Sequence, residues 1–203
     1  MARPRALPRG PHRLAREEVL ASQRGRLLDA IAEVVALRGY GAATVANVID
    51  HAGVSRKTFY EHFRDKESCF LAVYDAGVEV LLATMREAGG ESDHPAGRVR
   101  ALVRAYLGTL ALEPAFARSL LIEVAAVGDR ALARRREVHD AFADFLAEVA
   151  PEDAVAETTR LAAVGATQEI VARWVEDGQA APLEELEDAI VDVNLRLLAP
   201  DAA

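Results

Sequence analysis

The stretch TVANVIDHAGVSRKTFYEHF, which spans residues 44–63, decides the fold of this chain. Its residue pattern predicts two short helices joined by a sharp turn. Thr44 is a good N-cap for a first helix that runs to about His51, because its hydroxyl can accept a hydrogen bond from a free backbone N–H. Gly53 stands where the chain must turn, and a residue without a Cβ tolerates the positive φ that such a turn requires.

Apolar residues in this stretch recur at helical spacing, so each helix has one face for a core. Val45, Val48 and Ile49 lie three and four residues apart on the first helix. Phe59 and Phe63 lie four residues apart on the second helix and share a face. The other side chains of the second helix are expected to point outward, and most of them are polar.

These outward side chains form a set suited to reading DNA. An arginine guanidinium can form two hydrogen bonds to guanine O6 and N7, while lysine and tyrosine can reach phosphates. A recognition helix contacts bases with its N-terminal residues, which here include Arg56 and Lys57. The predicted DNA contacts on this helix and its N-cap are Ser55, Arg56, Lys57, Thr58, Tyr60 and His62.

Charge is distributed unevenly along the chain, whose formal net charge is −8. Residues 1–66 carry 12 Lys and Arg against 7 Asp and Glu, while residues 67–203 carry 12 against 25. A basic surface gains affinity for DNA by releasing the counterions that condense on the phosphates. The asymmetry is compatible with a DNA-binding N-terminal part, although chance also produces such differences.

Residues 24–73 resemble the DNA-binding domain of the TetR (tetracycline repressor) family. The matching features occur in order along the chain, and together they cover a quarter of it. They are Arg38-Gly39-Tyr40, Thr44-Val45, Ala52-Gly53-Val54-Ser55, Thr58-Phe59-Tyr60-Glu61-His62-Phe63 and Lys66-Glu67.

The resemblance implies roles for individual residues. Thr44, Tyr60, His62 and Lys66 occupy positions where the family contacts the phosphate backbone, and Arg56, Lys57 and Thr58 those where it reads bases. Arg24 and Arg26 are weaker phosphate candidates. Tyr60 could instead be a core aromatic and His62 a solvated side chain. Asp50 departs from a DNA-facing pattern, since an acidic residue repels phosphate, and we expect it to face away.

The remainder of the chain is expected to be helical, because Pro and Gly interrupt apolar-periodic segments at each junction. The fold class is all-α, with a helix-turn-helix domain at 16–66, a helical effector-binding and dimerisation domain at 67–203, and a flexible basic arm at 1–15. A first helix ends at Arg38 and begins near residue 16 or 22. The later expected helices are 67–88, 97–112, 115–127, 129–149, 152–176 and 182–198.

Two features of the C-terminal part suggest partners. Apolar stripes on the last two expected helices suit a four-helix interface between two copies, although ordinary core packing explains them too. Polar residues among apolar ones suggest a ligand pocket, although they could simply face water. The candidate ligand residues are Phe116, Leu120, Glu123, His139, Phe142, Glu169, Arg173 and Trp174, and Gln168 is a further polar residue of the same region.

Several function classes lack support in the sequence. We find no phosphate-binding glycine loop, no His-Glu-x-x-His and no nucleophile elbow, so an enzyme is not expected. The five histidines lack ligand spacing, so neither a metal nor a cofactor is expected. The single cysteine excludes an internal disulfide, and the N-terminus does not read as a secretory signal. Without a membrane-spanning run, we expect a cytoplasmic protein.

The expected function is that of a homodimeric transcriptional regulator, most simply a repressor that a small molecule releases from a palindromic operator. Two alternatives remain open at this point. One is a helical small-molecule-binding protein in which DNA binding is vestigial, and the other is an activator or non-specific DNA binder without an effector. The effector and the operator sequence do not follow from the residues.

Overall fold

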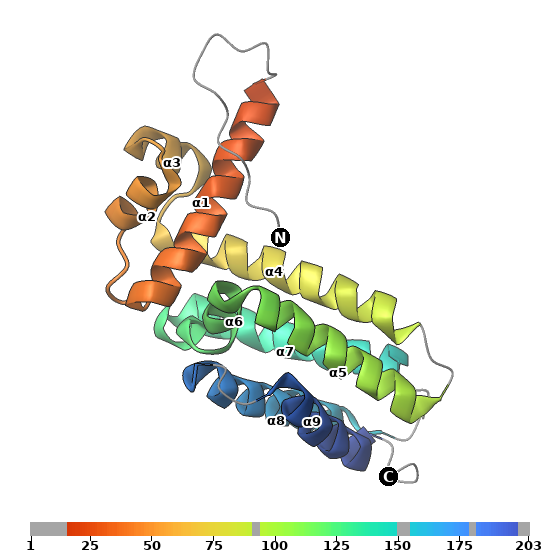
Figure 1. The fold of residues 1–203 in the computed structure, drawn as a ribbon. Helices are drawn as coiled ribbons and strands as arrows, with labels where there is room; N and C mark the ends of the chain where they lie inside the picture. Colours follow the sequence, from red (N-terminus) through yellow and green to blue (C-terminus); the bar gives the residue numbers. More distant parts are fainter. Residues whose placement is uncertain (1–15, 91–93, 150–154, 179–181, 199–203) are drawn as a thin grey trace. The chain divides into compact units, whose positions relative to one another are not determined.

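The computed structural model describes residues 16–90, 94–149, 155–178 and 182–198, and the elements within them are helices joined by turns and short loops (Figure 1). No strand occurs within these ranges, which confirms the all-α prediction. The predicted arm, 1–15, lies outside the described residues. The chain divides into two compact units, 1–76 and 77–203. The functional boundary between residues 66 and 67 stays a prediction.

The first unit consists of α1 (Arg16–Arg38), α2 (Val45–Ala52), α3 (Arg56–His62) and the first half of α4 (Lys66–Gly89). The prediction that the first helix begins near residue 16 is confirmed, and Ser22 lies inside it rather than at its N-cap. The helices enclose an apolar core whose fully buried members are Leu27, Ile31, Val35, Val48, Phe59, Cys69 and Phe70.

Side-chain caps hold the short helices in place. The Thr44 Oγ1 accepts from the backbone N–H of Asn47 at 3.2 Å, and the Asn47 Oδ1 accepts from the backbone N–H of Thr44 at 3.1 Å. This reciprocal capping box satisfies N–H groups that the first turn of α2 leaves without partners. Gly53 ends α2 at φ 63°, as its place in the turn predicts. Val48 is fully buried, whereas Val45 and Ile49 are half-buried.

Cys69 lies in the interior of the first unit. Its thiol is fully buried and donates to the backbone oxygen of Leu27 at 3.8 Å. Burial raises the pKa of this thiol to about 12, because the low-dielectric core disfavours the thiolate.

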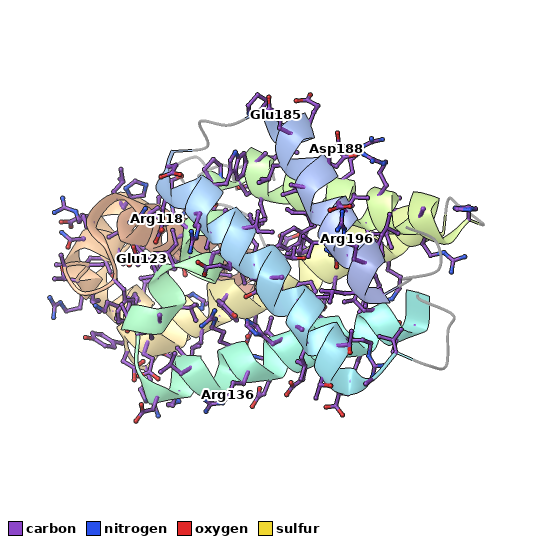
Figure 2. All side chains as sticks on the ribbon, turned by 90° about the horizontal axis from the view of Figure 1, so that it is seen from below. Arg118, Glu123, Arg136, Glu185, Asp188 and Arg196 are labelled. Atoms are coloured by element: carbon purple, nitrogen blue, oxygen red, sulfur yellow. The ribbon has the colours of Figure 1, made fainter. Side chains whose placement is uncertain are left out.

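The second unit contains the end of α4 followed by α5 (Pro95–Leu112), α6 (Pro114–Leu121), the 3₁₀ helix η1 (Glu123–Ala126), α7 (Asp129–Val149), α8 (Glu157–Glu176) and α9 (Leu183–Leu198). Helix α8 packs against α6, α7 and α9, and α9 also packs against α5. Figure 2 shows α8 and α9 crossing over the interior of this bundle.

Two helix predictions in this unit need correction. The single helix expected at 115–127 is α6 followed by η1, because the chain tightens after Leu121 into i→i+3 bonds such as Ala125 N–H to Ile122 O. The helix expected at 152–176 begins at Glu157. The N-cap residue Ala156 has a non-helical backbone, with φ −58° and ψ 147°, and the guanidinium of Arg160 donates to the oxygen of Val155.

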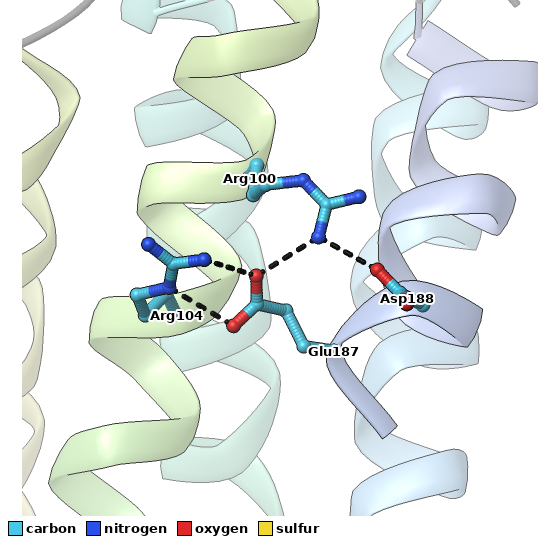
Figure 3. Close-up of polar contacts among 4 residues, drawn as sticks. All are labelled: Arg100, Arg104, Glu187 and Asp188. Atoms are coloured by element: carbon cyan, nitrogen blue, oxygen red, sulfur yellow. Dashed lines mark hydrogen bonds and ion pairs between the residues drawn. The ribbon is translucent and has the colours of Figure 1, made fainter. Parts of the chain in front are cut away.

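An ion-pair network joins α5 to α9 (Figure 3). The carboxylate of Glu187 accepts from Arg104 Nη2 at 2.8 Å and from Arg100 Nη1 at 3.0 Å, and Arg100 also donates to Asp188 at 2.7 Å. The two arginines hold the pKa of the Glu187 carboxyl below its usual value, mainly through the hydrogen bonds of Arg104. A buried carboxylate is tolerated here because cations neutralise it.

Helix α4 belongs to both units. By length and composition it is the one described helix that could cross a membrane. Cys69, Phe70 and Tyr74 are buried in the first unit, however, and Leu81 is buried in the second. Gly77 lies at a close approach to α6, since a Cβ there would overlap the ring of Phe116. These contacts place part of α4 in the interior of each unit, while 33% of its apolar window is buried.

Candidate functional site

Helix α3 is fixed to the first unit by its N-cap and by two phenylalanines. The Ser55 Oγ accepts from the backbone N–H of Thr58 at 3.0 Å and lies 2.9 Å from the Thr58 hydroxyl. Phe59 and Phe63 are buried, with ring centroids 5.9 Å apart. The core therefore sets which face of α3 is turned to solvent, as the spacing predicts.

The exposed face of α3 carries two cations that differ in their partners. Lys57 forms a loose ion pair with Glu61, at 3.8 Å between Nζ and Oε1. Arg56 is exposed, and none of the described residues binds its guanidinium. Tyr60 is 51% exposed, with its ring edge-on to Phe59, so the alternative of a core aromatic is wrong. Arg56, Lys57 and Tyr60 thus lie on one accessible helix, as predicted.

His62 and Lys66 are less accessible than the sequence suggests. The Lys66 ammonium donates to the backbone oxygens of Tyr40 at 2.6 Å and Ala43 at 2.8 Å, and lies 3.9 Å from the centroid of the Tyr40 ring. Burial lowers the pKa of this ammonium. His62 is half-buried, and its Nε2 has no hydrogen-bond partner among the described residues. Their phosphate contacts stay predictions.

Residues flanking α3 help to hold the turn. Arg26 donates to the backbone oxygen of Gly53 at 3.4 Å, and the Arg24 guanidinium lies 5.6 Å from the centroid of the Phe63 ring. His51 Nε2 lies 2.6 Å from the carboxylate of Glu33, which joins α2 to α1. Asp50 is exposed. Parts of both candidate arginines therefore engage the protein itself.

The second unit contains a cavity of about 60 Å³. That is room for roughly four to six water molecules, at the 10–15 Å³ that each requires. Residues of α4, α5, α7, α8 and α9 contribute to its wall. The lining residues are Met85, Val99, Leu102, Val103, Tyr106, Phe142, Leu146, Val164, Thr167, Gln168, Asn194 and Leu198.

The cavity includes one of the eight predicted ligand residues, Phe142. Glu169 and Arg173 form an exposed ion pair of 2.8 Å one turn apart on α8. Glu123 accepts from Arg118 at 3.2 Å, and the two lie side by side in Figure 2. The ring of Phe116 packs against α4 at Gly77 and does not line the cavity. Ligand contacts by these residues stay predictions.

The remaining three predicted ligand residues are at least partly buried, but they do not line the cavity. Leu120 and Trp174 are buried, and His139 is half-buried. The pKa of His139 is lowered, chiefly by burial and also by the positive charge of Arg135, so its imidazole favours the neutral form. The His139 Nε2 is buried without a hydrogen-bond partner among the described residues, and His139 does not line the cavity.

Sequence reasoning missed most of the polar wall of the cavity. Thr167 and Asn194 lie on α8 and α9, and the Asn194 Nδ2 donates to the Thr167 Oγ1 at 2.9 Å. A signal was available, because Asn194 interrupts the apolar stripe of the last helix. Nothing local indicates that its partner lies 27 residues earlier. Within the part of the chain that the structure describes, no group of three His, Cys, Asp or Glu residues could hold a metal ion.

Comparison with known proteins supports the sequence resemblance. Residues 27–73 match the family model described as "Bacterial regulatory proteins, tetR family". The HTH-type transcriptional activator FasR of Mycolicibacterium smegmatis is 38% identical over 104 residues, which are 51% of this chain and 46% of that protein. The HTH-type transcriptional repressor KstR2 of Mycobacterium tuberculosis is 32% identical over 84 residues, 41% of this chain and 42% of that protein. The aligned regions thus span less than half the length of these relatives.

Solved structures share the whole fold at low sequence identity. The fatty acid degradation regulator FadR from Bacillus halodurans superposes with a TM-score of 0.76 at 20% identity, covering 95% of this chain and 97% of that one. FadR from Bacillus subtilis, solved in complex with stearoyl-CoA, gives a TM-score of 0.75 at 19% identity, covering 86% and 97%. Residues 27–73 therefore match the DNA-binding domain of the tetR family of bacterial regulatory proteins, and the chain shares the fold of these solved structures.

Proposed function

We propose that this protein is a dimeric, cytoplasmic transcriptional regulator that binds a palindromic DNA operator through α3 and is controlled by a small ligand. The observation that carries the proposal is the exposed face of α3. Arg56 is presented to solvent at the N-terminal end of a helix whose orientation is fixed by Ser55 and Phe59. A recognition helix reads bases from this end.

Arg56 and Lys57 are assigned different tasks. Arg56 has no partner among the described residues and can form the two parallel hydrogen bonds that guanine accepts, so it is the proposed base-reading residue. Lys57 is a point charge drawn towards Glu61, and its proposed partner is a phosphate. Thr44 and Tyr60 would make further phosphate contacts, because both side chains are accessible in the first unit.

Lys66 is assigned a supporting task instead of a direct one. Its ammonium already has two backbone oxygens and an aromatic ring as partners, and a phosphate contact would require it to give these up. We propose that Lys66 fixes the loop that precedes α2, so that Thr44 is held at the DNA surface. Its loss would weaken DNA binding through the position of Thr44.

Dimerisation is proposed through the last two helices, as the apolar stripes on α8 and α9 and the family relationship suggest. A two-fold dimer would place two α3 helices about one DNA turn apart, roughly 34 Å, and so would demand an inverted repeat in the operator. Analytical ultracentrifugation tests this step. A chain that is monomeric at micromolar concentration and also when bound to its operator would contradict it.

The ligand is proposed to be largely apolar, because most of the cavity wall is aliphatic or aromatic. The stearoyl-CoA bound to the structural neighbour from Bacillus subtilis favours a fatty-acid-derived compound. The named relatives include an activator and repressors. We propose repression relieved by the ligand, and a reporter gene behind the operator, with and without ligand, would show the direction of control.

The test of DNA binding is a mobility-shift titration with the DNA upstream of the protein's own coding region, repeated at several salt concentrations. Arg56→Ala is compared with Arg136→Ala, which removes the same charge from the exposed face of α7 (Figure 2). We expect a saturable shift that excess non-specific DNA does not abolish. Loss of one base-reading arginine costs about 1–3 kcal/mol, or roughly 5- to 150-fold in affinity. Equal effects of the two variants on DNA affinity would show that Arg56 does not contact the DNA.

A further inference from the structure

The cavity of the second unit combines an apolar wall with one polar side. None of its twelve lining residues is charged. Thr167 and Gln168 approach it from α8, and Asn194 approaches it from α9. A ligand segment inside the cavity therefore meets hydrogen-bonding groups but no countercharge.

The orientation of the Asn194 amide follows from its partners. Its Nδ2 donates to the backbone oxygen of Ile190 at 2.9 Å and to the Thr167 Oγ1 at 2.9 Å. A backbone oxygen only accepts hydrogen bonds, so the nitrogen of the amide must face Ile190. Both amide hydrogens are then used, and the Oδ1 of the same side chain is turned away from them.

The Asn194 Oδ1 is an acceptor without a donor. Asn194 is 5% exposed as a residue, and no described residue donates a hydrogen bond to this oxygen, which keeps contact with solvent at the cavity. A ligand that fills the cavity would displace water from it, and a carbonyl oxygen that loses water without gaining a donor is unfavourable. A ligand O–H or N–H group would replace the lost hydrogen bond, whereas a group that only accepts would not.

We infer that the cavity selects an uncharged, largely apolar ligand segment carrying one hydrogen-bond donor, which it recognises through the Asn194 Oδ1. This inference rests on the proposed function of the cavity as the effector site. A carboxylate is disfavoured there for two reasons, because it would face the partial negative charge of Oδ1 and because the cavity offers no cation. Any charged part of a larger effector would lie outside the cavity.

Three six-carbon probes separate these possibilities, measured by isothermal titration calorimetry on the full-length protein at pH 7. They are 1-hexanol, which donates and accepts, its isomer 1-methoxypentane, an ether that only accepts, and hexanoate, which is charged. We expect 1-hexanol to bind at least about tenfold more tightly than the ether, the difference made by roughly one satisfied hydrogen bond. Hexanoate is expected to show no saturable binding.

The variant Asn194→Leu is expected to bind 1-hexanol and the ether equally. Glu187→Gln is the matched control, because it weakens the attachment of the same helix without touching the cavity, and it is expected to keep the preference for the alcohol. Thermal unfolding of both variants checks that they are folded.

The inference is overturned if wild type binds the alcohol and the ether alike, if hexanoate binds as well as 1-hexanol, if none of the probes binds, or if Asn194→Leu retains the preference. None of these measurements involves DNA. A negative result with the three probes therefore does not affect the mobility-shift test of Arg56. A negative mobility-shift result likewise does not affect the ligand-binding test.

Discussion

Polar side chains serve different purposes in the two units. In residues 1–76 several of them bind the backbone close to helix ends, as Thr44, Ser55 and Lys66 do, and one side-chain pair, His51 with Glu33, joins two helices. In residues 77–203 the principal polar contacts join side chains of different helices, as between Glu187 and Arg104. Backbone contacts fix the conformation of a short loop or helix, whereas side-chain pairs fix which helices are neighbours. The first unit therefore presents a preset surface, and the second is a bundle whose helices enclose a small cavity.

The largest effect on stability is expected from a substitution in the interior of the first unit. Phe59 is fully buried and touches both Phe63 and Tyr60, so Phe59→Ala removes the contact that orients α3. We expect a loss of about 3–5 kcal/mol in the free energy of unfolding, as for other large-to-small core changes. Urea denaturation followed by circular dichroism measures it. A loss below about 1 kcal/mol would mean that α3 is held by its caps alone.

The interior of the second unit is tested at the contact between α4 and α6. A Cβ at Gly77 would overlap the Phe116 ring, which is itself buried and cannot swing away freely. We expect Gly77→Ala to cost about 1–3 kcal/mol by overpacking. The matched control is Gly108→Ala on α5, where no atom lies within 4 Å of the added carbon. That variant is expected to gain up to about 1 kcal/mol through helix propensity. Equal effects at both sites would contradict the close approach.

The ion pairs of the second unit are tested by Glu187→Gln, for which we expect a loss of about 1–2 kcal/mol at pH 7. The pKa of Glu187 is lower in the folded state than in the unfolded chain, so its contribution is present above its usual pKa and disappears as the pH falls through the lowered value. Denaturation curves of the variant and wild type should therefore converge below about pH 4. A difference that stays constant from pH 7 to pH 3 would show that charge is not responsible.

The smallest effect is expected at a cap of the first unit. Thr44→Ala removes the acceptor for the Asn47 N–H and should cost about 1 kcal/mol. Thr44→Ser keeps the hydroxyl and is the control, with an expected change within about 0.5 kcal/mol. Thermal unfolding of the two variants measures the difference. If Thr44→Ser were as damaging as Thr44→Ala, the methyl group rather than the capping bond would be the stabilising element.

The sequence predicted the first unit in detail because its determinants are local. The caps Thr44 and Ser55 act on N–H groups three residues later, and Phe59 and Phe63 are four residues apart, so residue type and spacing predict them, whereas the part of Asn47 in the capping box was not predicted. The cavity could not be predicted in the same way. The role of Asn194 depends on its hydrogen bond to Thr167, which lies 27 residues earlier. The role of Glu187 depends on Arg104, which lies 83 residues away. Such pairings depend on which helices pack together, which periodicity does not determine.

The buried thiol of Cys69 is a built-in probe for opening of the N-terminal unit, because its rate of chemical modification reports how often the core around it opens. With its pKa raised to about 12 and its sulfur enclosed by the core, the thiol does not react with a maleimide or disulfide reagent while the unit is closed. Each labelling event therefore records an excursion in which the core around α1 and α4 has come apart. Comparing the rate of modification with and without operator DNA would measure how much DNA reduces the opening of this unit, without any added probe or engineered residue.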